Sequence, residues 1–267
     1  MIGVELAKLV RRPRTWVTIA LLAGLPTLVA VFIAVTKVGP RPGEGPAFLS
    51  AVLTNGNLFP AAALAIVLPL FLPIAVAVVA GDAVAGEADA GTLRYLLVRP
   101  VGRTRLLVAK LVSVTAFIGL AVLIVAVVAY VVGTHLFGSH PLPSVSGTQL
   151  STASATLRII GAVLYVGASM LGVAAFAIFF STLTDSPLAA ALGALAVLVI
   201  SQVLVLLDAA AAVRPYLPTR YWLSFIDFFR DPIYWREIQR GLALQGVYVG
   251  ALLAAAWANF STKDVTS

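Results

Sequence analysis

Six long apolar stretches constrain the fold of this chain more than any other feature of its sequence. A helix that spans a membrane needs about 20 mostly apolar residues, and each stretch has that length. The stretches are Trp16–Thr36, Leu58–Ala80, Leu106–Val132, Ile159–Ser181, Pro187–Leu207 and Leu242–Phe260. Only helices and closed barrels satisfy their backbone in lipid, and the ten-residue alternation of barrel strands is absent. We therefore predict an all-α polytopic membrane protein, a single transmembrane domain over residues 1–267 with six transmembrane helices.

The composition agrees with this class and excludes several others. Charged residues make up 11% of the chain, whereas soluble domains have about 25%. The net charge is +7, but the basic residues form short clusters between apolar runs, which is typical of orientation signals in a bilayer and not of a nucleic-acid surface. The chain has no cysteine, so disulfides and cysteine-ligated zinc are excluded.

The distribution of lysine and arginine predicts the orientation in the membrane. The basic residues at the predicted inner side are Lys8, Arg11, Arg12 and Arg14 in the leader, Arg94, Arg99, Arg103, Arg105 and Lys110 after the second stretch, and Lys263 in the tail. The segments 37–57 and 133–158 are poor in them, so both termini and the 81–105 loop are predicted to be cytoplasmic. The first stretch lacks an A-x-A cleavage site and is interpreted as a retained helix of a multi-pass protein in the cell membrane.

The segment 208–240 is the exception, because it holds five arginines on the predicted outer side. Four acidic residues offset them, and a segment of this size can be translocated despite its charge. Its many aromatic rings predict short helices at the outer headgroup level, where ring bodies are buried and polar tips are hydrated. A packed cap and a role in substrate handling both remain open for this segment.

Few polar residues lie deep in the predicted spans. Ser201 and Gln202 form the main polar pair, and they either line a substrate path or bond across a helix interface. Pro69 and Pro73 predict a bend near the middle of the second span, as a gating hinge or as a static kink.

No catalytic, metal or cofactor site is predicted. His135 and His140 have no acidic residue nearby and make a poor ligand set. The closest approach to the phosphate-binding motif GxxxxGK(S/T) is Gly81–Ala88, where Glu87 replaces the required lysine. If transport is energised by ATP, a separate subunit must bind the ATP and its Mg²⁺.

The sequence from Gly86 to Pro100, GEADAGTLRYLLVRP, predicts structure inside the cytoplasmic loop. Gly91 suits the left-handed conformation that ends a helix, and Thr92 can cap a second one. Pro100 stops that helix after about two turns. Leu93, Leu96 and Leu97 share one of its faces, so this short helix needs a surface to hold it: lipid headgroups, the protein's own helices or a partner.

This loop resembles the cytoplasmic loop of ABC-2-type permeases, the membrane subunits of one class of ATP-binding-cassette transporters. The resemblance rests on GEADAGTLRYLLVRPVGRTRLLVAKL, on ELAKLVRRPRTW near the start and on AWANFSTKD near the end. In the tail, Ser261 and Thr262 stand where a basic residue often occurs.

The resemblance implies a permease that works as a homo- or heterodimer with two cassette ATPase subunits, and an exporter direction. It implies that the 81–105 loop forms a coupling helix seated in the ATPase and that residues 1–15 lie along the inner membrane surface. By position, the implied coupling residues are Glu87, Gly91, Thr92, Leu93, Arg94, Leu96, Leu97 and Arg103. Substrate identity does not follow from the sequence.

Two other classes of function remain. An ion-coupled secondary carrier would place acidic residues or broken polar helices near the membrane midplane. An intramembrane enzyme acting on lipids would show paired catalytic groups within a span, and such pairs are absent from the sequence. Dependence on an ATPase separates the permease from both.

Overall fold

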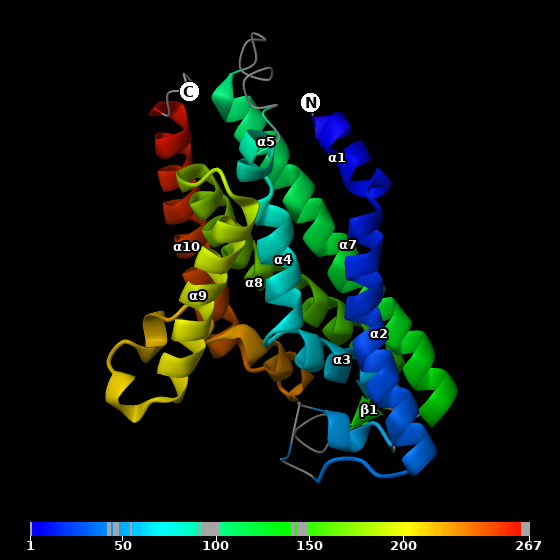
Figure 1. Cartoon of the computed structure of the whole chain (residues 1–267). Helices are drawn as coiled ribbons and strands as arrows, with labels where there is room; N and C mark the ends of the chain where they lie inside the picture. The colour runs from blue at the N-terminus through cyan, green and yellow to red at the C-terminus, as the bar shows by residue number, and fades with distance from the viewer. Residues whose placement is uncertain are drawn as a thin grey trace.

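The protein is an elongated bundle of helices in its computed structural model (Figure 1). The structure describes residues 2–41, 44, 48–53, 55–89, 91, 102–139, 142–143 and 149–262. Five helices are long and apolar enough to cross a membrane, as expected for a multi-pass membrane protein. They are α2 (Pro13–Thr36), α7 (Arg103–Phe137), α8 (Thr152–Leu183), α9 (Pro187–Leu206) and α10 (Trp235–Thr262).

The second predicted span, 58–80, is not one helix. It consists of α3 (Phe59–Val67) and α4 (Phe71–Gly81), which meet at an angle of 58°. The bend lies at the predicted prolines: Pro69 is in the break and Pro73 is in the first turn of α4. The predicted bend at these prolines is confirmed, and six spans are obtained only if this bent pair counts as one.

The α8 helix is at the centre of the bundle, where it contacts α4, α7, α9 and α10. The α2 helix lies outside this group and packs mainly along α7. Large side chains fill the interior; the fully buried aromatic ones are Phe59, Phe117, Phe225, Phe229 and Phe260. The outward faces stay apolar, as in Leu28 and Leu164, which are 70% and 68% exposed. Such faces are expected for helices that contact lipid.

Both ends of the chain lie at the same end of the bundle, next to α5 (Ala85–Asp89) (Figure 1). The short α1 helix (Ile2–Arg11) precedes α2 and packs against the first half of α7. The chain bends between them because Pro13 occupies the first turn of α2 and the backbone of Arg12 is extended.

Two connecting segments are shorter than predicted. The α7 helix extends to Phe137 and α8 begins at Thr152, which shortens the predicted 133–158 loop. Its strands β1 (Leu142–Pro143) and β2 (Gln149–Leu150) pair antiparallel, a small departure from an all-α fold. Trp235 begins α10, so residues 235–240 belong to a long helix and not to the predicted 208–240 segment.

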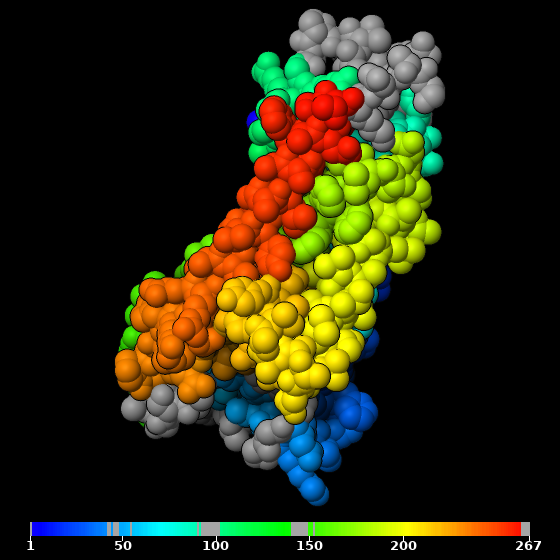
Figure 2. All heavy atoms as spheres, turned by 90° about the vertical axis from the view of Figure 1, so that its left-hand side faces the viewer, coloured from blue at the N-terminus to red at the C-terminus, as the bar shows by residue number. Residues whose placement is uncertain are grey.

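The remaining 208–234 segment contains the 3₁₀ helices η3 (Asp208–Ala210), η4 (Arg214–Tyr216) and η5 (Trp222–Phe229). These agree with the predicted short helices. Figure 2 shows the segment against the lower parts of α9 and α10, at the end of the bundle away from the C-terminus.

Candidate functional site

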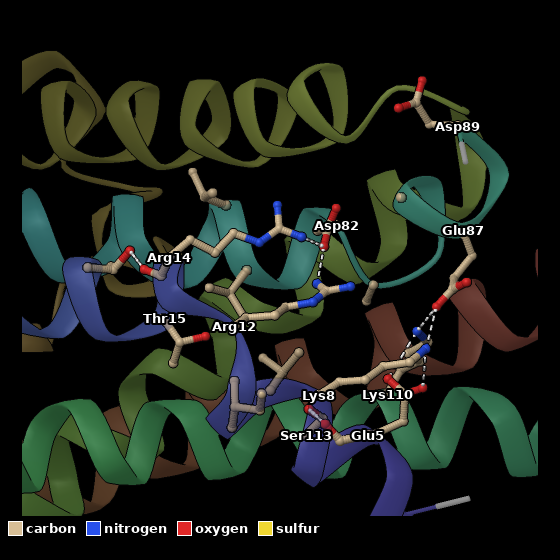
Figure 3. Close-up of a pocket in the computed structure, with 17 residues that line it drawn as sticks. Glu5, Lys8, Arg12, Arg14, Thr15, Asp82, Glu87, Asp89, Lys110 and Ser113 are labelled. Atoms are coloured by element: carbon tan, nitrogen blue, oxygen red, sulfur yellow. Dashed lines mark hydrogen bonds and ion pairs between the residues drawn. The ribbon is translucent and has the colours of Figure 1, made fainter. Parts of the chain in front are cut away.

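A polar pocket of about 580 Å³ lies beside the end of the bundle that holds α5 and the chain termini. Its walls come from α1, the beginning of α2, the end of α4, α5 and the first turns of α7 (Figure 3). The charged residues that line it are Glu5, Lys8, Arg12, Arg14, Asp82, Glu87, Asp89 and Lys110. Four acidic and four basic side chains thus meet in a protein that is poor in charge.

Four of these side chains form one ion-pair network, and Lys110 is its most buried member. Lys110 Nζ lies 3.1 Å from Glu5 Oε2 and 2.8 Å from Glu87 Oε1. Lys8 Nζ bonds the same two carboxylates, at 3.4 and 3.2 Å. The Lys110 side chain is 7% exposed, whereas that of Lys8 is 41% exposed. The network therefore joins α1, α5 and α7 through two carboxylates and two ammonium groups.

The protonation of Lys8 reflects this arrangement. Burial lowers the pKa of Lys8, but the attraction of Glu5 and the hydrogen bond and attraction of Glu87 outweigh that effect. The pKa of Lys8 is therefore raised above its ordinary value of 10.5, and the ammonium group is charged at neutral pH.

A second group of charges joins α2 to the end of α4. Asp82 Oδ2 accepts from Arg12 Nη1 at 2.8 Å and from Arg14 Nη2 at 3.0 Å. Figure 3 shows the two guanidinium groups converging on this carboxylate from the same side of the pocket. A single carboxylate thus meets two arginines at the beginning of α2.

The connection between α4 and α5 is held by Ser181 of α8. Its hydroxyl donates to Gly81 O at 2.7 Å and accepts from Val84 N at 3.1 Å and Ala85 N at 2.8 Å. Gly81 also packs against α9 so closely that a Cβ there would lie 3.0 Å from Ala191 N. These contacts fix the turn that places Asp82 and Glu87 in the pocket.

The beginning of α7 is joined to the end of α10. Arg103 Nη1 donates to Phe260 O and Ser261 O, both at 2.9 Å, so a cation meets the carboxyl end of α10. Trp257 Nε1 donates to Thr104 Oγ1 at 2.8 Å. The first turn of α7 is thereby fixed to the last turns of α10.

Comparison with known protein families assigns the chain to one of them. The family model described as "Protein of unknown function (DUF2705)" matches residues 27–265. This chain belongs to the DUF2705 family. The search of curated proteins finds no match.

Three of the predicted coupling residues of this DUF2705 protein lie among the described residues. Glu87 is in the ion-pair network, and Arg103 binds the end of α10. Gly91 has a φ of 65°, which confirms the left-handed conformation predicted for it. The other five, Thr92, Leu93, Arg94, Leu96 and Leu97, lie outside the described residues.

The predicted substrate-path residues lie elsewhere, and none of them lines the pocket. Pro73 has no N–H to donate to Pro69 O, four residues earlier, so that carbonyl loses its intrahelical partner. Gln202 Nε2 of α9 donates to it at 2.6 Å. Gln202 therefore bonds across a helix interface, which was one of its two predicted roles, and it supports the break between α3 and α4.

Ser201 belongs to a set of contacts that hold the 208–234 segment. Its hydroxyl lies 2.7 Å from Thr219 Oγ1 and accepts from Thr219 N at 3.3 Å. Backbone carbonyls nearby accept from three more side chains of the long helices: Tyr165 to Tyr221 O, Gln245 to Pro218 O, and Tyr248 to Tyr216 O. These contacts favour the packed cap among the two interpretations of this segment.

The pocket was not predicted from the sequence. Lys8, Arg12, Arg14 and Lys110 were interpreted as orientation signals only, and Asp82 was assigned no partner. Glu5 and Lys8, three residues apart on one helix face, were the only local signal, because the other pairs join residues at least 23 positions apart.

Proposed function

We propose that this DUF2705 protein is the permease subunit of an ABC-2-type transporter, driven by a separate cassette ATPase. The observation that carries the proposal is the Lys110 network. It fastens α5, the element just before the predicted coupling residues, to α1 and to α7. A segment that receives force from an ATPase needs such rigid connections to the helices that it moves.

The second end of the same loop is also fixed. The α7 helix begins at Arg103, which is bonded to the end of α10. Residues 92–101 thus lie between two points of attachment, one through Glu87 and one through Arg103. This arrangement supports a loop that transmits motion to several helices at once.

The polar residues in the spans favour the permease over an ion-coupled carrier. Among the described residues, the ion pairs lie near helix ends or in the connecting segments, except that Lys110 lies two turns inside α7, at the end of the bundle that holds α5. Gln202, in α9, is bonded to a backbone carbonyl. An ion-coupled carrier is expected to place ionisable groups near the midplane instead.

The geometry of Gly81–Ala88 supports a separate ATPase. These residues form the end of α4, a turn and the beginning of α5, and Gly81 is packed against α9. Backbone N–H groups of the turn are bonded to Ser181. They are not available to cradle a phosphate in the manner of an ATP-binding loop.

The proposal includes a dimer of permease protomers, cytoplasmic termini and an exporter direction. Topology is tested with single cysteines, since the chain has none of its own. A cysteine at Asp89 should react with an impermeant reagent only in opened cells, and one at exposed Tyr216 should react in intact cells. Labelling of the Asp89 position from outside would contradict the orientation.

Function is tested by expressing the chain together with a cassette ATPase from the same genome, taken from a neighbouring reading frame if one encodes it. The two proteins should co-purify, and ATP hydrolysis should depend on the complex in lipid nanodiscs. Leu96→Asp with Leu97→Asp should break the complex, because carboxylates enter an apolar socket. Arg99→Ala, a change of one charge in the same segment, is the control and should be milder.

Three results would contradict the proposal. The double aspartate variant could insert normally and keep its ATPase, which would remove the docking role of the leucines. The chain alone could bind ATP saturably. It could also transport in vesicles with an ion gradient and without any ATPase, which would establish the secondary carrier.

A further inference from the structure

The two arginines that share Asp82 keep most of their capacity to bind an anion. Each guanidinium has five N–H donors, and each makes one side-chain hydrogen bond to the described part of the chain, to Asp82 Oδ2. Two positive charges meet one negative charge, so one positive charge remains uncompensated. The side chains of Arg12 and Arg14 are 43% and 64% exposed, so a ligand can reach them.

The other charges of the pocket do not cancel this excess. Glu5 and Glu87 are neutralised by Lys8 and Lys110 within their own network. Asp89 lies at the edge of the pocket, and within the described part of the chain it forms no ion pair with either arginine (Figure 3). The positive charge is therefore concentrated where α2 meets the end of α4.

The walls of the pocket continue into an apolar track. Val78 and Val79 of α4 line the pocket together with Val114 of α7. Phe71, Ile74 and Val78 are spaced three and four apart, so they share one face of α4, and they are 42%, 37% and 51% exposed. This face leads from the break at the start of α4 to the arginines. A cationic end joined to an apolar track fits an amphiphile with an anionic head.

We propose that the pocket binds the headgroup of an anionic membrane phospholipid, with Arg12 and Arg14 as ligands of its phosphate. The acyl chains would lie along the exposed face of α4. The volume of about 580 Å³ is within the range of small-ligand sites, about 300–1,000 Å³. Thr15 lines the same pocket, and its hydroxyl makes no side-chain hydrogen bond to the described residues, so it provides a further donor.

Basic pockets between helices at the membrane surface suit anionic headgroups because both the phosphate charge and the burial of the chains favour binding. This site does not depend on the proposed transport function. Binding is measured on the purified chain, without an ATPase, so the two proposals succeed or fail separately.

The test is native mass spectrometry of the chain in detergent with added phosphatidylglycerol or phosphatidylcholine. The wild type should retain one phosphatidylglycerol per chain and prefer it to phosphatidylcholine, whose choline cancels the charge. Arg12→Gln with Arg14→Gln should weaken phosphatidylglycerol binding by about tenfold or more. Arg11→Gln is the matched control, since Arg11 is exposed and does not line the pocket, and it should change binding by less than about twofold.

Two further variants test lipid binding at the pocket if the double variant does not fold. Arg14→Gln alone keeps the pair of Arg12 with Asp82 and should still weaken binding. Asp82→Asn removes the competing carboxylate and should strengthen it. Equal binding by the wild type and the Arg14→Gln variant would overturn the proposal, as would equal retention of the two lipids. Displacement of the lipid by inorganic phosphate would show a site for free anions and overturn the lipid assignment.

Discussion

Substitution of Lys110 by methionine tests the ion-pair network most directly. The Lys110 side chain is 7% exposed, and its ammonium group contacts two carboxylates that are each 12% exposed. Lys110→Met removes the buried cation and leaves Glu5 and Glu87 with Lys8 as their shared partner. Methionine keeps most of the volume, so the change is mainly electrostatic.

The expected loss of stability follows from the burial of the groups. Removing one partner of a fully buried ion pair costs about 3–5 kcal/mol, because an uncompensated charge stays buried. Lys8 still neutralises one of the two carboxylates, so we expect about 2–3 kcal/mol for Lys110→Met. Lys8→Met is the matched control. It removes the same kind of group from the same carboxylates, but the side chain is 41% exposed, so its loss should be about 0.5–1 kcal/mol.

Unfolding by sodium dodecyl sulfate in mixed micelles, followed by tryptophan fluorescence, measures these free energies. Adding Glu87→Gln to Lys110→Met should recover part of the loss, because one buried charge disappears. A loss of stability for Lys110→Met no larger than that for Lys8→Met would contradict the stabilising role of the buried ammonium group, as would a larger loss after Glu87→Gln is added.

Three further predictions use the same unfolding assay. Gly133→Ala should destabilise the protein by about 1–3 kcal/mol, because the new Cβ would come within 2.6 Å of a side-chain carbon of α3. Its control is Gly119→Ala in the same helix, where the new Cβ meets no atom within 4 Å. This variant should stabilise the protein by about 0.5–1 kcal/mol. Equal changes in stability for the two alanine variants would contradict the close packing of Gly133 against α3. Gln202→Leu should cost about 1 kcal/mol, because Pro69 O loses its donor; no loss would exclude that role. The contribution of Lys8 should be constant at neutral pH and disappear as pH rises above about 10.5, since its folded pKa is raised. Loss of the Lys8 contribution to stability well below pH 10.5 would contradict a raised pKa in the folded protein.

The helices of the protein could be predicted from the sequence because each forms from the apolar residues of its own segment. A run of about 20 apolar residues favours a helix in lipid, and α2, α7, α8 and α10 each contain a predicted stretch, while α9 ends one residue before its stretch does. Proline acts on its own turn, so the bend at Pro69 and Pro73 was also predictable. The same holds for Gly91, whose missing Cβ permits the left-handed backbone.

The partners of the polar side chains were decided only by the tertiary structure. Gln202 was predicted either to line a substrate path or to bond across helices. In the structure its side chain donates to the carbonyl of Pro69, 133 positions away. Lys110 was predicted as an orientation signal, yet it lies buried between Glu5 and Glu87 because α1 and α5 pack against α7. The role of a charged or amide side chain depends on the groups that contact it in the folded protein. Those groups come from separate helices, whose contacts no local pattern in this sequence specifies.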